Sequence, residues 1–275
     1  MELHTMANPE QFLPFQPALQ NSHQLKNYQQ QMQNCRGISH FYSFTTDDNL
    51  NNALVIPDNC IDILFDCNTH QPTARVYGTV SRYKPVELIS GHRYFGIRFM
   101  PGIMPDYIDL IPEDMPDHEY NFLDIIPGAA SVIEDIALRE NFTQQIKVFN
   151  ESMANKALRQ SSQITQYLIT EVMRNNGNIK IGELEKDIGY SSRNIYRIFL
   201  NDTGVSLKLF SRFLRMQIAI NMIRHPGKPS LTDIATELGF SDQSHFIKDF
   251  KTLTGVSPRK MKAQLSQPAV CLSQA

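Results

Sequence analysis

The chain has few cysteines and no long apolar stretch. Its 275 residues include Cys35, Cys60, Cys67 and Cys271, whose spacing is not that of a disulfide framework or a zinc module. No apolar run reaches the roughly 18 residues that a membrane-spanning helix needs. The first fifteen residues lack the basic start and apolar core of a secretory signal. We therefore expect a reduced, cytoplasmic protein with no membrane partner.

Motifs of the common catalytic classes are also missing. The sequence has no glycine loop that could cradle a phosphate, no nucleophile elbow and no HExxH zinc motif. The N-terminal half lacks the His-rich strands of a metal-holding barrel. We therefore predict that the protein is not an enzyme, with no catalytic residues, no metal and no cofactor.

Two groups of residues leave an alternative open. Cys60, Cys67 and His70 are close in sequence and offer soft metal ligands, but a cysteine in an apolar strand is more often a small buried hydrophobe. Asp58, Asp62 and Asp66 alternate around a strand and suggest paired carboxylates for acid–base chemistry, whereas turn and edge roles are commoner.

Charge is divided unevenly between the halves. Residues 155–275 carry 17 Lys and Arg against 9 Asp and Glu, a net charge of +8. Residues 1–154 carry 26 − 17 = 9 basic and 28 − 9 = 19 acidic residues, a net charge of −10. The basic half suits a phosphate backbone, and the acidic half needs another role.

One segment of the basic half occurs twice, which indicates a supersecondary unit used twice. The segment Ile181–Ser206 recurs as Leu231–Ser257. At an offset of 231 − 181 = 50, the residues Ile181, Leu184, Ile188 and Gly189 recur as Leu231, Ile234, Leu238 and Gly239. At an offset of 257 − 206 = 51, the residues Ile195, Arg197, Phe199, Thr203, Gly204, Val205 and Ser206 recur as Phe246, Lys248, Phe250, Thr254, Gly255, Val256 and Ser257.

Each copy is typical of a helix-turn-helix. Apolar residues three and four apart place one face of the first helix inward, and a glycine follows at the helix end. Ser191 or Ser192 is predicted to cap the second helix of the first copy, and Ser241 or Asp242 that of the second. The second helices direct polar side chains outward from their first turns, which is how base edges are read in the major groove.

These residues resemble the AraC/XylS family of bacterial transcription regulators. The resemblance covers about Ser162 to Leu265, through IGELEKDIGYSSRNIYRIFLNDTGVS, the helix LRMQIAINMI and LTDIATELGFSDQSHFIKDFKTLTGVSPRKMK. It implies seven helices, with two recognition helices set about one DNA turn, near 34 Å, apart.

The resemblance also implies which residues meet DNA. Arg193, Tyr196 and Arg197 match base-reading positions of the first recognition helix, and Gln243, Ser244, His245 and Lys248 those of the second. The expected DNA-binding set further includes Ser191, Ser192, Asn194 and Lys208, the last as a phosphate contact. The competing interpretation is that Arg193, Arg197 and Lys248 are solvated surface cations.

The N-terminal half is predicted to be β-rich and to end in two helices. Ala53–Ile56, Ile61–Phe65, Arg75–Val80 and Tyr94–Met100 form the expected strands. Helices are expected at Ala129–Glu140 and Gln144–Leu158, with Thr143 as N-cap of the second. Their apolar stripes pack either on the sheet or on a second subunit. Asp62, Tyr77, Tyr94 and Arg98 are candidate polar groups of a ligand pocket.

The complete expectation is an α+β chain. A β-rich sensor or oligomerisation domain spans 1–158, a short polar link follows at Arg159–Ser162, an AraC-type DNA-binding domain spans 162–265, and a disordered tail spans 266–275. The pieces VIPDNCIDILFD and GIRFMPG resemble a small domain found ahead of AraC-type regions, and its ligands are largely unassigned.

The predicted function is sequence-specific transcription regulation. The expected partners are double-stranded DNA, RNA polymerase, a small-molecule effector whose contact residues the sequence does not identify, and a second copy of the chain. One alternative is a ligand-independent regulator whose N-terminal half only dimerises or docks a protein. The other is a DNA-repair enzyme fusion that uses Cys35, although no repair motif surrounds that residue.

Overall fold

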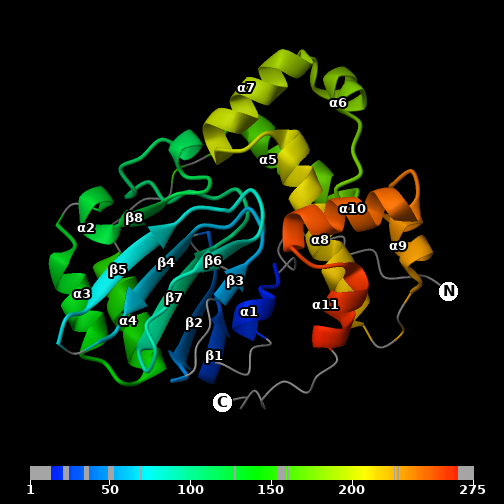
Figure 1. The fold of residues 1–275 in the computed structure, drawn as a ribbon. Helices are drawn as coiled ribbons and strands as arrows, with labels where there is room; N and C mark the ends of the chain where they lie inside the picture. Colours follow the sequence, from blue (N-terminus) through cyan, green and yellow to red (C-terminus); the bar gives the residue numbers. More distant parts are fainter. Residues whose placement is uncertain are drawn as a thin grey trace.

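The computed structural model describes residues 14–20, 25–33, 37–48, 53–68, 70–126, 128–153, 159, 161–225, 227 and 229–265. An antiparallel sheet dominates the N-terminal half and helices make up the C-terminal half (Figure 1). This confirms the predicted α+β class. Within these residues, no helix is both long enough and apolar enough to cross a membrane.

A six-stranded sheet forms the body of the N-terminal half, in the order β1-β2-β7-β4-β5-β8 with antiparallel neighbours. A separate pair, β3 and β6, lies beside it. The strands are β1 (Leu25–Met32), β2 (Ile38–Thr46), β3 (Ala53–Val55), β4 (Asp62–Asp66), β5 (Thr73–Tyr77), β6 (Lys84–Val86), β7 (Arg93–Phe99) and β8 (Glu119–Asn121).

Alternation along the central strands gives the sheet two different faces. On β4, Ile63 and Phe65 belong to a large apolar core with Ile136 of α3 and Phe149 of α4. Helices α2 (Phe122–Ile125), α3 (Ala130–Ala137) and α4 (Phe142–Ser152) contribute to that core. The helix pair therefore packs on its own sheet, which is the first of the two arrangements predicted for it.

The opposite face carries the polar and aromatic side chains that alternate with this core. Tyr42, Phe44, Leu64 and Tyr94 form a smaller cluster there. Tyr42 of β2 lies opposite Gly96 of β7, and a Cβ at position 96 would overlap the tyrosine ring. Glycine thus leaves room for a buried aromatic ring over the sheet.

The helical half packs around the long helix α8 (Leu207–Arg224). Its other helices are α5 (Gln163–Arg174), α6 (Ile181–Ile188), α7 (Ser192–Thr203), α9 (Leu231–Glu237), α10 (Gln243–Thr254) and α11 (Pro258–Leu265). Phe15 and Ile56 of the N-terminal half belong to the same apolar core. Phe15 lies two residues before the start of the short helix α1 (Pro17–Gln20).

Several local predictions need correction or cannot be tested. Asn141, not Thr143, caps α4, because its side-chain oxygen accepts from Thr143 N and Gln144 N. Strands β1, β2, β6 and β8 were not predicted. The expected second helix ends at Ser152, with Met153 as its C-cap, and residues 154–158 of the expected range lie outside the described residues, as do Cys35, Cys271 and the tail.

Candidate DNA interface and a cavity beside the sheet

The first helix-turn-helix has the predicted turn. Helix α6 ends at Gly189, whose φ of 69° is left-handed, and Ser191 caps α7 by accepting from Asn194 N. Ser192, the other predicted cap, is the first residue of the helix, and its N–H donates to the Glu185 carboxylate. The cap satisfies one of the free N–H groups with which a helix begins.

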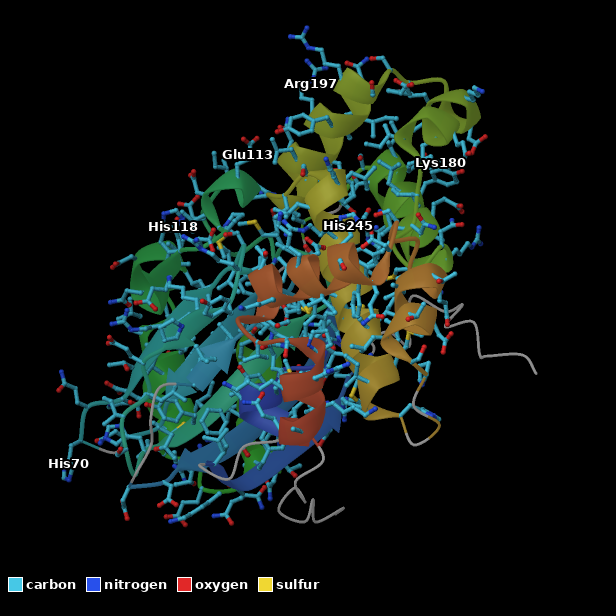
Figure 2. All side chains as sticks on the ribbon, turned by 45° about the vertical axis from the view of Figure 1, so that its right-hand side comes forward. His70, Glu113, His118, Lys180, Arg197 and His245 are labelled. Carbon is cyan, nitrogen blue, oxygen red and sulfur yellow. The ribbon has the colours of Figure 1, made fainter. Side chains whose placement is uncertain are left out.

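One face of α7 is apolar and buried, and the other is polar and exposed. Ile195 and Phe199 are buried. The exposed residues are Ser191, Ser192, Arg193, Asn194, Tyr196 and Arg197. Figure 2 shows Arg197 projecting outward from α7. Among the ion pairs of the described residues, none involves Arg193 or Arg197.

The second helix-turn-helix repeats this construction. Ser230 and Asp233 form a capping box at the start of α9, and Gly239 has a φ of 70°, matching Gly189. Of the two predicted caps of α10, Asp242 accepts from His245 N at 2.8 Å. Buried Phe246 and Phe250 face inward.

The predicted DNA-reading residues of α10 differ in how free they are. Ser244, His245 and Lys248 are exposed. Gln243 is half-buried, and its Oε1 accepts from Thr232 Oγ1 at 2.9 Å, which holds its side chain against the preceding helix. The His245 ring meets Phe240 edge-on, with ring centroids 5.3 Å apart. Lys208 is exposed in the first turn of α8, after the N-cap Ser206.

A cavity of about 70 Å³ lies on the aromatic face of the sheet. Its wall includes Tyr42 and Phe44 of β2, Tyr77 of β5 and residues of the β3–β6 pair. An adjoining open groove of about 560 Å³ shares Leu64, Tyr77 and Glu119 with it. Three of the four candidate pocket residues, Asp62, Tyr77 and Arg98, line the cavity, and Tyr94 lines the groove.

A buried ion cluster forms part of the cavity wall. Arg98 Nη2 donates to Asp62 Oδ2 at 2.7 Å and its Nη1 donates to Asp58 Oδ2 at 2.8 Å. Tyr42 Oη also donates to Asp62, at 3.0 Å. Asp62 begins a central strand, so the edge role predicted for these aspartates is wrong for it. The cluster joins the turn before β4 to strands β4, β7 and β2.

Burial changes the pKa of several groups in this cluster. It raises the pKa of Asp58 above its usual value, although Arg98 works against the shift. Burial opposes the charge of Arg98, but Asp62 and Asp58 together raise its pKa well above the ordinary range. Burial, aided by Arg98, lowers the pKa of His40 to about 3. Arg98 therefore stays charged and His40 neutral at physiological pH.

The two cysteines that the structure describes are buried. Cys60 and Cys67 are 2% and 4% exposed, and burial raises the pKa of each thiol. This confirms the interpretation of both as buried hydrophobes. His70 is exposed, at the end of the sheet domain away from the helical half (Figure 2). Among the described residues, no three His, Cys, Asp or Glu side chains gather as a metal site would require.

The segment around Phe15 joins the cavity to the helical half, and no sequence signal indicated it. Gln16 Nε2 donates to Asp58 Oδ2 and to Ile56 O, both at 2.7 Å. One residue earlier, Phe15 N donates to Gln217 Oε1 of α8 at 2.8 Å, and the Arg224 guanidinium lies 3.6 Å from the Phe15 ring centroid. Two adjacent residues therefore link the cavity wall to α8: Gln16 is hydrogen-bonded to Asp58, and Phe15 is hydrogen-bonded to Gln217.

Comparison with known proteins matches two parts of the chain. A helix-turn-helix domain model matches residues 184–264, and a domain of unknown function, DUF6597, matches residues 35–120. The probable transcription factor PqrA of Proteus vulgaris is 32% identical over 105 residues, which cover 38% of this chain and 84% of PqrA.

Two further similarities cover comparable shares of the chain. The putative HTH-type transcriptional regulator YkgA of Escherichia coli K12 is 35% identical over 113 residues, 41% of this chain. The match spans 46% of YkgA, less than half of that protein's length. A crystal structure of a probable AraC family transcriptional regulator from Rhodopseudomonas palustris is 28% identical, with a TM-score of 0.32, over 38% of this chain and 94% of that one.

Proposed function

Because this chain belongs to the AraC/XylS family of bacterial transcription regulators, we propose that it binds specific DNA sequences and regulates transcription from them. One observation carries the proposal. Two capped recognition helices, α7 and α10, repeat the same turn and expose polar first turns. The net charge of +8 over residues 155–275 supplies the attraction to phosphate that such binding needs.

We assign reading of bases to Arg193 and Arg197 of α7 and to Gln243 and Lys248 of α10. Arginine donates two hydrogen bonds to the major-groove edge of guanine, and each such contact contributes about 1–3 kcal/mol of discrimination. Lys208 is assigned to phosphate, because it lies exposed near the N-terminus of α8.

Binding-site selection with the full chain tests this assignment. Arg193→Ala should relax the preference at one base position, whereas Lys208→Ala should weaken binding to all sequences alike and leave the selected motif unchanged. If Arg193→Ala returns the wild-type motif with wild-type affinity, Arg193 does not read bases. If the wild-type chain selects no motif, the proposed function itself is wrong.

We also propose that the cavity holds a small-molecule effector. Pockets of this kind combine apolar walls with a few placed polar groups, as Tyr42, Phe44 and Asp62 do here. The lining includes four acidic residues, Asp58, Asp62, Asp117 and Glu119, against two basic ones, Lys84 and Arg98. Arg98 is paired with two of the aspartates, and Lys84 Nζ donates to the carbonyl of Asp117 at 3.1 Å. Because carboxylates outnumber cations around the cavity, we expect a neutral or positively charged effector.

A thermal-shift screen of the full chain against matched neutral, cationic and anionic metabolites tests the effector proposal. A ligand at 100 times its dissociation constant should stabilise the folded state by about 2.7 kcal/mol. Tyr42→Leu, which alters the cavity wall, should abolish the shift, and Leu138→Ala, on the exposed end of α3, should not. If no compound raises the melting temperature, the N-terminal half acts by dimerisation or protein docking instead.

A further inference from the structure

Two loops of the sheet domain are tied into one unit. They comprise residues 78–86, which include strand β6, and residues 112–119, which include the 3₁₀ turn η2 (Pro112–Asp114) and reach the first residue of β8, and Asp117 joins them. Asp117 Oδ1 accepts from Ser81 N at 2.7 Å, and Asp117 N donates to Thr79 O at 2.9 Å. Gly78 N also donates to His118 O at 3.1 Å. Movement of one loop must therefore move the other.

The second of these loops packs against the first helix-turn-helix. Its 3₁₀ turn η2 packs against α7. Gly204, the left-handed C-cap of α7, meets the Pro112 carbonyl so closely that a Cβ there would overlap the oxygen. With its amide turned to satisfy both acceptors, Asn201 Nδ2 donates to Glu113 Oε1 at 2.9 Å. Figure 2 shows Glu113 beside α7.

The first loop contacts the second helix-turn-helix at the equivalent position, the C-terminal end of α10. Tyr83 N donates to Leu253 O at 2.9 Å, which satisfies one of the carbonyls that the end of α10 leaves unpaired. The Tyr83 ring covers Gly255, the left-handed C-cap of α10, where a Cβ would lie 3.0 Å from the ring.

Gly204 and Gly255 are equivalent positions of the sequence repeat (255 − 204 = 51). The sheet domain thus contacts both recognition helices at the same structural point, their C-terminal ends. Each helix has 12 residues and is about 18 Å long, so the first turns of both extend away from the sheet domain and stay free for DNA.

The helix between the two units is anchored by the same domain. Asn59 Nδ2 donates to Phe210 O at 3.2 Å, and Gln217 Nε2 donates to Pro57 O at 2.9 Å. Contacts at three places along the helical half, on α7, α8 and α10, limit the rotation of one helix-turn-helix relative to the other.

We propose that the tied loops 78–86 and 112–119 are a brace that fixes the separation and orientation of the two recognition helices. The brace thereby selects the half-site spacing that DNA must offer, with Tyr83, Pro112 and Glu113 as positioning residues. The inference rests on the proposed DNA-binding function. Thr79, Lys84 and Asp117 of the brace also line the cavity, so an occupant of the cavity acts on the same loops.

The test uses the full chain and the DNA motif that it selects, with the distance between the two half-sites varied one base pair at a time. Wild type should prefer one spacing. Tyr83→Ala with Glu113→Ala should bind that spacing about tenfold more weakly, a loss of about 1.4 kcal/mol, and should discriminate less among spacings. Its affinity for a single half-site should change by less than about twofold, because neither residue belongs to the DNA-reading face.

Two control proteins separate positioning from a general loss of folding. Tyr83→Phe with Glu113→Gln keeps the ring, the backbone donor and an acceptor for Asn201, and should restore the wild-type spacing profile. Leu54→Ala with Ile111→Ala removes two exposed side chains of the same domain and should behave as wild type.

The outcomes distinguish the two proposals. The brace proposal is wrong, and the DNA-binding proposal is unaffected, in either of two cases. In the first, wild type and the Tyr83→Ala/Glu113→Ala variant have the same spacing profile. In the second, the variant loses as much affinity for a single half-site as for the preferred spacing. If wild type selects no DNA motif, the proposed function has failed first.

Discussion

Replacing Arg98 with methionine leaves Asp58 and Asp62 buried without their shared cation. The side chains of Arg98, Asp58 and Asp62 are only 6%, 5% and 13% exposed, so solvent screens their interactions little. Removing one partner of such a buried ion cluster costs about 3–5 kcal/mol, because an uncompensated charge stays inside. We expect Arg98→Met to lower the free energy of unfolding of the sheet domain by that amount.

A matched arginine on the same sheet provides the control. Arg75 pairs with Glu119 at 3.0 Å, but the two side chains are 55% and 47% exposed. Exposed pairs contribute about 0–1 kcal/mol, so Arg75→Met should cost little. The triple change Asp58→Asn, Asp62→Asn and Arg98→Met removes every charge of the cluster and should recover most of the loss.

Native-state hydrogen exchange of peptides from β4 and β7, read by mass spectrometry, measures this cost in the full chain. It reports the opening free energy of the strands themselves, which a single melting curve of the whole chain does not. If Arg98→Met and Arg75→Met lower that free energy equally, by less than about 1 kcal/mol, the cluster does not stabilise the cavity wall.

Three further predictions concern acid sensitivity, a helix cap and the helical half. Burial holds the pKa of His40 at about 3, against 6.5 in the unfolded chain. The contribution of neutral His40 to the free energy of unfolding is therefore complete above pH 6.5. It is lost as pH falls towards 3, by up to about 1.4 kcal/mol per pH unit. His40→Gln should lessen the dependence of the unfolding free energy on pH, measured by urea unfolding between pH 7 and 4, and an identical dependence would contradict this. Burial raises the pKa of Asp58, so protonation of Asp58 favours the folded state as pH falls, and it does so equally in the wild type and the variant. Asn141→Ala should lower the protection of α4 amides by about 1 kcal/mol in hydrogen exchange, whereas Thr143→Ala should not; equal effects would refute the cap. The fragment 162–265 should show a helical circular dichroism spectrum and bind DNA with affinity that falls steeply with salt; an unfolded fragment would refute the predicted domain boundary.

The DNA-binding half was largely predictable because its signals are local and occur twice. Gly189 and Gly239 take the left-handed turn that the repeat indicates, and a capping residue follows each turn within three positions. The sequence left Ser191 and Ser192 equivalent as caps, since either hydroxyl suits an N-cap, and only the geometry of α7 decides between them. The half-buried Gln243 is hydrogen-bonded to Thr232 of the preceding helix, a contact that no spacing rule encodes.

The sheet domain was less predictable because its contacts join distant residues. Strand β2 mixes aromatic and small polar residues, and both of its faces are buried, so it lacks the polar face that usually reveals a strand. Asp62 and Arg98 were singled out by residue type, but their pairing depends on the register of β4 with β7. Gln16 is hydrogen-bonded to Asp58, 42 positions later in the chain. Tyr83 is hydrogen-bonded to Leu253, 170 positions later (253 − 83).

The most direct test of the account is a methylation-interference footprint of the full chain on its selected DNA. Methyl groups at guanine N7 lie in the major groove, where α7 and α10 should read the bases. The account predicts two patches of interference about one helical turn, 10–10.5 base pairs, apart on one face of the DNA. A single patch, or interference restricted to the minor groove, would contradict reading by two recognition helices.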